Sequence, residues 1–150
     1  MRKIILLTLL ILISCTSSVD KNCLSSGMEA VQIEWGYITS ANSSKYYRLY
    51  TNNLVEIYKN NDAEFNRIDT LSITKVEMCD LVNKTTNLFF KIQSLNVPAD
   101  SNNFIIYYNK KTGVQLRALW NPLHNNMGNK EFKELYENFM SAVLEKESRK

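Results

Sequence analysis

Few residues in this chain of 150 have the types and spacing that catalysis needs. His124 is the only histidine, and no Gly-x-Ser-x-Gly or other nucleophile signature accompanies it, although a Ser–His–Asp triad needs only one histidine. We therefore interpret His124 as a solvated loop residue. Glu34 and Glu56 are expected on one sheet face, where paired carboxylates could serve a glycosidase. Scattered glutamates on a solvent-facing strand are much commoner, so this reading is disfavoured.

The N-terminal segment has the order of a secretory signal. Arg2 and Lys3 form a short basic head, and the apolar run from Ile4 to Ile13 is broken only by Thr8. The run is too short to cross a bilayer as a stable helix, and a small residue follows it. We therefore expect the chain to be exported.

The end of this segment, Leu12-Ile13-Ser14-Cys15, resembles the lipobox of bacterial lipoproteins, with an aliphatic residue, a small residue and then Cys at the cleavage point. The resemblance implies that residues 1–14 are removed and that Cys15 carries two or three acyl chains, which anchor a protein without spanning the membrane. Thr16 stands where an Asp would indicate inner-membrane retention in enteric bacteria, which favours the outer membrane, with a periplasmic or surface-facing domain. The alternatives are an ordinary signal cleaved elsewhere and a chain that keeps its apolar N-terminus.

Lipidation of Cys15 would leave two cysteines, Cys23 and Cys79, in an oxidising compartment. An even remainder favours a disulfide, which would stabilise the fold by about 4 kcal/mol in the chain-entropy model. The first alternative is a free Cys79 buried on a helix with Cys23 in a disordered segment. The second, a catalytic thiol, is disfavoured because Cys79 lies in an apolar helical pattern far along the chain from His124.

Composition argues against several function classes. Without its signal the chain has 136 residues, the size of one domain, and the formal charge falls from +3 to about +1. Such a chain has no basic patch for nucleic acid. One histidine and two bonded cysteines cannot supply a zinc tetrad, and calcium loops and glycine-rich phosphate loops are absent. We expect no metal, no cofactor and no enzyme activity; the expected partners are the membrane and an envelope protein.

Alternation of apolar and polar residues predicts a half-buried sheet. The expected strands span residues 31–37, 45–51, 54–59, 104–108 and 114–120. Asn52-Asn53 predicts a tight turn because asparagine tolerates a positive φ, and Gly113 is available for the left-handed position of a second hairpin. Asn60 to Asn66 is expected to be a polar loop.

Two amphipathic helices are predicted from apolar residues at helical spacing. The first begins at Ser72 or Thr74, where Thr74 and Glu77 have the spacing of a capping box, and ends near residues 93–95. Asn129 is the expected N-cap of the second helix. Residues 145–150 are expected to be a charged, frayed tail.

The expected fold class is α+β, with an antiparallel sheet of about five strands and two helices on one face. The element order is strand–strand–strand–helix–strand–strand–helix. We assign residues 1–14 to the signal peptide, 15–28 to the lipidated Cys15 and a polar tether, and 29–150 to one domain. In size and element order the domain resembles small uncharacterised α+β lipoproteins of Gram-negative bacteria, a resemblance without a motif that implies no functional residues.

The sheet face away from the helices is the candidate interaction face. If Trp35, Leu49, Ile57 and Leu116 point to the core, seven residues point outward: Glu34, Tyr46, Arg48, Tyr50, Glu56, Tyr58 and Arg117. Binding surfaces favour Tyr and Arg, although aromatic residues also populate exposed strands for their β-propensity alone. Changing Arg48 and Tyr50 to Ala is expected to weaken partner capture with little effect on stability.

These observations predict a lipid-anchored envelope protein that acts by contact with another protein, as inhibitors, immunity proteins and accessory subunits do. The alternative is a protein that binds a small glycan or lipid in a cleft between sheet and helices. A filled core beneath an exposed Tyr and Arg face would favour the first function. A concave, mostly apolar pocket would favour the second.

Overall fold

A computed structural model describes residues 23–24, 26–39, 44–61, 64–124 and 128–148. The expected signal peptide and the expected lipidation site at Cys15 lie outside these residues. Within the described ranges, no helix is both long and apolar enough to cross a membrane.

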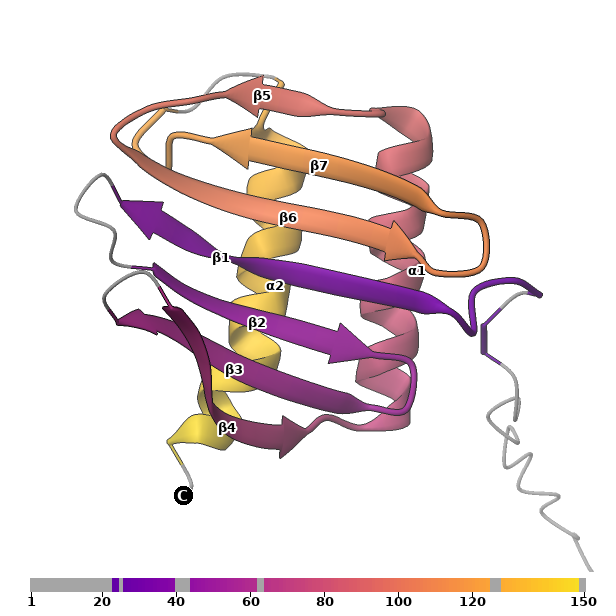
Figure 1. Cartoon of the computed structure of the whole chain (residues 1–150). Helices are drawn as coiled ribbons and strands as arrows, with labels where there is room; N and C mark the ends of the chain where they lie inside the picture. Colours follow the sequence, from indigo (N-terminus) through magenta and orange to yellow (C-terminus); the bar gives the residue numbers. More distant parts are fainter. Residues whose placement is uncertain (1–22, 25, 40–43, 62–63, 125–127, 149–150) are drawn as a thin grey trace, which may run out of the picture.

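The described residues form one sheet with two helices on the same face (Figure 1). The elements in chain order are β1 (Val31–Thr39), β2 (Ser44–Tyr50), β3 (Leu54–Asn61), β4 (Glu64–Ser72), α1 (Lys75–Lys91), β5 (Leu95–Val97), β6 (Ser101–Asn109), β7 (Val114–Trp120) and α2 (Lys130–Glu147). The strand order is β4-β3-β2-β1-β6-β7-β5. The predicted α+β class with two helices is confirmed.

The prediction of five antiparallel strands is wrong, because the sheet has seven strands and is mixed. Of residues 60–66, expected as a polar loop, 60–61 belong to the end of β3 and 64–66 to the start of β4, and 62–63 lie outside the described residues. Because β4 is an edge strand whose residues 66–70 are all exposed, it lacks the alternation that marks a half-buried strand. β5 pairs parallel to β7 and has only three residues, which are too few to show an alternation of apolar and polar residues.

The turns form where the local signals predicted them. Asn53 has a φ of 70° and its N–H donates to the Tyr50 carbonyl at 3.2 Å. Gly113 has a φ of 72° in the turn between β6 and β7. Both positions need the left-handed conformation that asparagine and glycine adopt at low cost, so the two hairpins are confirmed.

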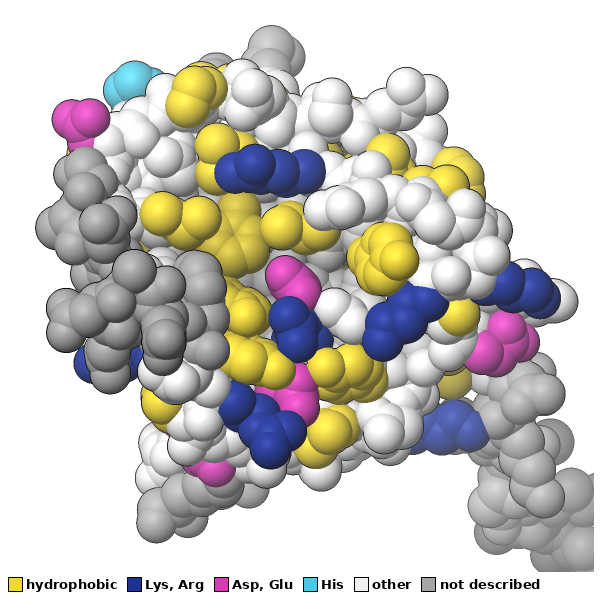
Figure 2. All heavy atoms as spheres, viewed as in Figure 1, with side chains coloured by type: hydrophobic (Ala, Val, Ile, Leu, Met, Phe, Trp, Pro, Cys, Tyr) yellow, Lys and Arg dark blue, Asp and Glu magenta, His cyan; other side chains and the backbone are white. Residues whose placement is uncertain are grey.

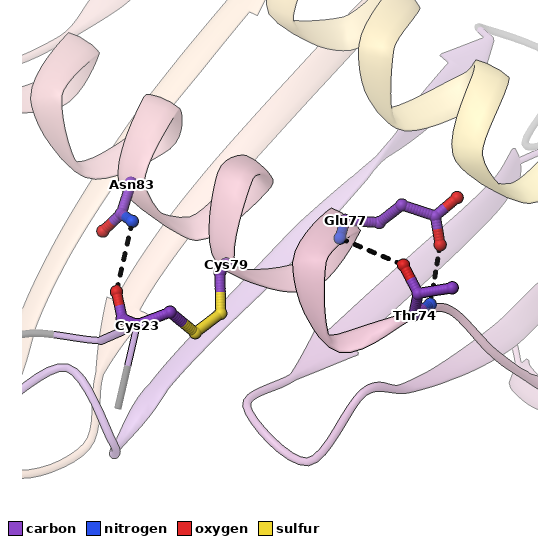
Figure 3. Close-up of a disulfide and its surroundings, with 5 residues drawn as sticks. All are labelled: Cys23, Thr74, Glu77, Cys79 and Asn83. Atoms are coloured by element: carbon purple, nitrogen blue, oxygen red, sulfur yellow. Dashed lines mark hydrogen bonds between the residues drawn. A yellow bond between two sulfur atoms is a disulfide. The ribbon is translucent and has the colours of Figure 1, made fainter. Parts of the chain in front are cut away.

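Helix α1 begins with the predicted capping box (Figure 3). The Glu77 N–H donates to the Thr74 hydroxyl at 3.2 Å, and the Thr74 N–H donates to the Glu77 carboxylate at 2.6 Å. These two bonds satisfy backbone donors that the first turn leaves without partners. The helix ends at Lys91, earlier than expected.

Asn129 occupies the predicted N-cap position of α2, but its side chain makes no capping hydrogen bond. The Asn129 amide instead donates to the His124 carbonyl at 2.7 Å, and Asn129 is 1% exposed. Its side chain therefore holds the preceding loop rather than the first turn of the helix.

The expectation of a frayed tail is wrong for residues 145–147, since α2 continues to Glu147, and residues 149–150 lie outside the described part of the chain. Lys146 forms an ion pair of 2.6 Å with Glu77 at the start of α1, and Glu147 forms one of 3.0 Å with Lys45 on β2. These pairs join the last turn of α2 to two other elements.

Aromatic side chains hold α2 against the sheet. Trp35 on β1 is fully buried, and its ring stacks on Tyr47 of β2 and on Phe139 of α2 at centroid distances of 5.2 and 4.5 Å. Such stacked rings contribute beyond the apolar area that they bury. Buried side chains from both helices and from β1, β2, β3, β6 and β7 form one apolar cluster, so the layer between sheet and helices is filled.

The predicted disulfide between Cys23 and Cys79 is confirmed, with Cα atoms 5.8 Å apart (Figure 3). The Asn83 side chain also donates to the Cys23 carbonyl at 3.4 Å, and Leu24 and Met28 pack against the core. Part of the segment assigned to the tether is therefore attached to the domain. If Cys15 carries lipid, the eight residue steps from Cys15 to Cys23 span at most about 28 Å.

Candidate functional site

The seven predicted residues lie on the sheet face that neither helix covers, which we call the open face (Figure 2). They come from four strands: Glu34 on β1; Tyr46, Arg48 and Tyr50 on β2; Glu56 and Tyr58 on β3; and Arg117 on β7. Their neighbours Trp35, Leu49 and Ile57 are buried under the helices. Alternation along each strand therefore assigned the two faces correctly.

The strand register aligns charged residues in one row across the open face. Arg117 lies opposite Ile106, which lies opposite Glu34, and Arg48 is opposite both Glu34 and Glu56. We call Arg117, Glu34, Arg48, Glu56 and Arg67, which pairs with Glu56 from β4, the charge row. Figure 2 shows dark-blue and magenta side chains alternating across the middle of this face, with hydrophobic side chains on both sides.

Glu56 is the most enclosed member of the charge row. We expected it to face solvent, but the residue is only 7% exposed. Its carboxylate accepts hydrogen bonds of 2.7 Å from the Tyr50 hydroxyl, the Tyr58 hydroxyl and the Arg67 guanidinium. Burial alone would raise the pKa of Glu56, but these three donors outweigh it and lower the pKa to about 2. Burial and the bond to Glu56 raise the pKa of Tyr58 to about 12.

Arg48 connects the members of the row with the tyrosines beside it. Its Nε donates to Glu34 at 2.8 Å, and its Nη1 donates to the Tyr58 hydroxyl at 3.0 Å. The guanidinium carbon lies 4.8 Å from the centroid of the Tyr58 ring, which stacks on Tyr46 at 4.6 Å. Because so many groups depend on Arg48, we now expect Arg48→Ala to destabilise the fold, and it is unsuited as a test of binding alone.

Beside the charge row lies a depression of about 220 Å³, which we call the hollow. It is lined by Glu34, Ile38, Ser44, Tyr46, Phe104, Ile106 and Arg117. Gly36 lies between Glu34 and Ile38 on the same face of β1 and opposite Tyr46 and Phe104. Because Gly36 has no side chain, the backbone of β2 approaches β1 closely at this position.

Gly36→Ala is expected to lower the free energy of unfolding by roughly 1–3 kcal/mol, the usual cost of overpacking. A Cβ at Gly36 would lie 2.7 Å from the Cα of Tyr46 and closer still to the Lys45 carbonyl oxygen. These atoms belong to the backbone of β2 and cannot move without disturbing its pairing with β1. Urea unfolding measures the loss, with Val114→Ala at an exposed strand position as control. An unchanged urea midpoint for Gly36→Ala would contradict the expectation.

The geometry of Glu34 and Glu56 does not favour the glycosidase reading. Arg48 lies between the two carboxylates and pairs with both, at 2.8 Å and 3.8 Å. A general acid needs a raised pKa, whereas the pKa of Glu56 is lowered. His124 is exposed in its loop. In the part of the chain that the structure describes, no three His, Cys, Asp or Glu residues form a group that could hold a metal ion.

A second depression, of about 370 Å³, lies between the outer surfaces of α1 and α2. Lys91 of α1 and Glu131 of α2 line it and neutralise each other in an ion pair of 2.6 Å. None of the buried polar side-chain atoms found without a hydrogen bond in the described residues lines this depression. It therefore offers less to a ligand than the hollow does.

Sequence reasoning missed Arg67, Gly36 and the apolar wall of the hollow. Arg67 required knowledge of β4, and the role of Gly36 required the register of β1 with both its neighbours. On β6, Phe104 and Ile106 alternate with the core residue Ile105, so the strand is apolar on both faces. This run of apolar residues was the sequence signal for an apolar wall on the open face, because a strand with one solvated face would carry polar residues on that face.

No protein-family model matches this chain, and no curated protein matches it. The residues and geometry of the open face are therefore the basis for assigning a function to this chain.

Proposed function

We propose that this protein is a lipid-anchored protein of the cell envelope that binds another envelope protein through its open face and does not act as an enzyme. The observation that carries the proposal is the set of Tyr, Arg and Glu side chains held in place on a face that neither helix covers. Arg48, Tyr50 and Tyr58 are hydrogen-bonded before any partner arrives. Their ordering on binding therefore costs little, and Tyr and Arg are the residues that dominate binding hot spots.

The proposed location rests on the resemblance of Leu12-Ile13-Ser14-Cys15 to a lipobox, and Thr16 favours the outer membrane. The disulfide between Cys23 and Cys79 supports an exported protein, because such bonds persist in oxidising compartments. The short span from Cys15 to Cys23 would keep the domain close to the membrane surface. The partner would then be a membrane-associated or periplasmic protein within that reach.

The alternative function, binding of a glycan or lipid between sheet and helices, has less support. Buried side chains of the apolar cluster fill that layer. The hollow on the open face, at about 220 Å³, is also below the ~300–1,000 Å³ that pockets for small molecules commonly have. The depression of about 370 Å³ between the outer surfaces of the helices reaches that range, but its Lys91 and Glu131 pair with each other. Protein binding through the open face is therefore the better supported function.

Photo-crosslinking in cells tests the proposal with the full-length, lipidated chain. A photoreactive amino acid replaces Tyr108, which lies on the open face opposite Gln32 and Gln115. We expect one envelope protein to be captured in stoichiometric amount and identified by mass spectrometry. The control position is Phe90 on α1, which is 77% exposed on the helical side. Capture of nothing from position 108, or of the same proteins from both positions, would contradict the proposal.

A further inference from the structure

We propose that the hollow on the open face receives one apolar side chain of the protein partner and that Arg117 binds a carboxylate beside that side chain. This inference rests on the proposed function. It adds the chemistry of the partner, which presents an apolar anchor flanked by an Asp or Glu.

The size and walls of the hollow fit a single apolar side chain. Four of its seven lining residues, Ile38, Tyr46, Phe104 and Ile106, are aliphatic or aromatic, and its volume of about 220 Å³ is below that of most small-molecule pockets. Hot spots of protein interfaces are commonly small pockets that lose their water when one anchor side chain of the partner fills them, and polar residues surround them. The charge row provides polar residues at the edge of this hollow, since Glu34 and Arg117 belong to both.

A buried hydroxyl points to a ligand independently. Ser44 is 3% exposed and lines the hollow, and its Oγ has no hydrogen-bond partner among the described residues. Leaving a buried hydroxyl unpaired costs free energy, which a polar group of a bound partner would recover. The hollow therefore has an apolar wall and an unused donor at one end.

Among the described side chains on this side of the open face, the charged groups without an ion pair are positive. Arg48 and Gln32 donate to Glu34, and Arg67 neutralises Glu56. Arg117 is exposed at the hollow and, among the described side chains, has no carboxylate within ion-pair distance. Lys110 likewise lies over the Tyr50 ring at 5.6 Å with no described acidic partner. Complementarity therefore favours a partner segment that carries acidic side chains.

Two variants of the full-length protein test the inference by the cross-linking yield from position 108. Ile106→Trp fills the hollow and is expected to reduce the yield of the partner adduct at least ~10-fold, as loss of an anchor pocket does. Arg117→Glu reverses the unpaired charge and is expected to reduce the yield several-fold, about 5-fold or more. The matched controls are Leu123→Trp, at a residue 86% exposed, and Lys59→Glu, at an exposed residue of β3, and both should retain the wild-type yield.

The outcomes separate this inference from the proposed function. A partner captured from position 108 whose yield neither variant changes overturns the inference and leaves the proposed function standing. If Ile106→Trp reduces the cross-linking yield and Arg117→Glu does not, the role proposed for Arg117 is overturned. Absence of any partner overturns both.

Circular dichroism verifies that the variants fold. If Ile106→Trp unfolds the domain, Ile38→Trp, at a residue 39% exposed, fills the same space. The captured partner peptide must contain an apolar residue next to Asp or Glu; a peptide without them also overturns the inference.

Discussion

Removing the disulfide between Cys23 and Cys79 is expected to lower the free energy of unfolding by about 4 kcal/mol. The bond joins residues 56 positions apart and closes a loop that contains β1 to β4 and the start of α1. In the chain-entropy model, the bond restricts the unfolded chain more strongly as the loop lengthens. A loss of this size is large, because domains are commonly stable by only about 5–15 kcal/mol.

The measurement is urea unfolding of the wild-type protein with and without reductant, and of Cys23→Ala. This variant removes the bond and leaves the buried Cys79 in place, so the only atom lost is the sulfur of the partly buried Cys23. We expect reduced wild-type protein and Cys23→Ala to unfold at similar, lower urea concentrations, and the variant to be insensitive to reductant. A variant as stable as the oxidised wild type would show that the bond adds little to this fold.

Replacing Glu56 by Gln is expected to cost up to about 3 kcal/mol at neutral pH. The pKa of Glu56 falls from an ordinary 4.5 to about 2 in the folded protein, because three donors outweigh the effect of burial. A carboxylate with a lowered folded pKa contributes stability that is fully present above its unfolded pKa. That contribution is lost as the pH falls from about 4.5 toward 2.

Unfolding by urea at neutral pH, pH 4.5 and pH 3 measures both effects. The wild-type protein should lose stability between pH 4.5 and 3, whereas Glu56→Gln should start lower and lose less, because Gln does not titrate. Glu137→Gln, at an exposed position of α2, is the matched control and should follow the wild type. An equal loss between pH 4.5 and 3 for Glu56→Gln and the wild type would show that other carboxyl groups cause the acid sensitivity.

The hydrogen bonds that Glu56 accepts also affect the binding surface. Tyr50, Tyr58 and Arg67 all donate to Glu56, so its charge holds three side chains of the open face in place. Variants of Glu56 therefore change stability and the shape of the open face together. For this reason the binding experiments use Ile106 and Arg117, which lie outside this set of hydrogen bonds.

Several local features followed from the sequence by itself. Thr74 and Glu77 form the predicted capping box, because its bonds join residues three positions apart. Asn53 and Gly113 take the positive φ expected of them. Alternation separated Trp35 and Leu49 on the core side from the residues of the open face. These features depend on neighbouring residues only, so one stretch of chain is enough to predict them.

Other features were decided only by the tertiary structure. β4 is an edge strand whose residues 66–70 are exposed without alternation, and β5 is three residues long and pairs with a strand distant in the sequence. The charge row exists because strand register places Arg48 between Glu34 and Glu56, and the burial of Glu56 follows from the tyrosines and Arg67 around it. The hollow depends on the neighbours of Gly36 on both sides. Sequence patterns determine which face a side chain takes, whereas pairing between distant strands determines what lies beside it.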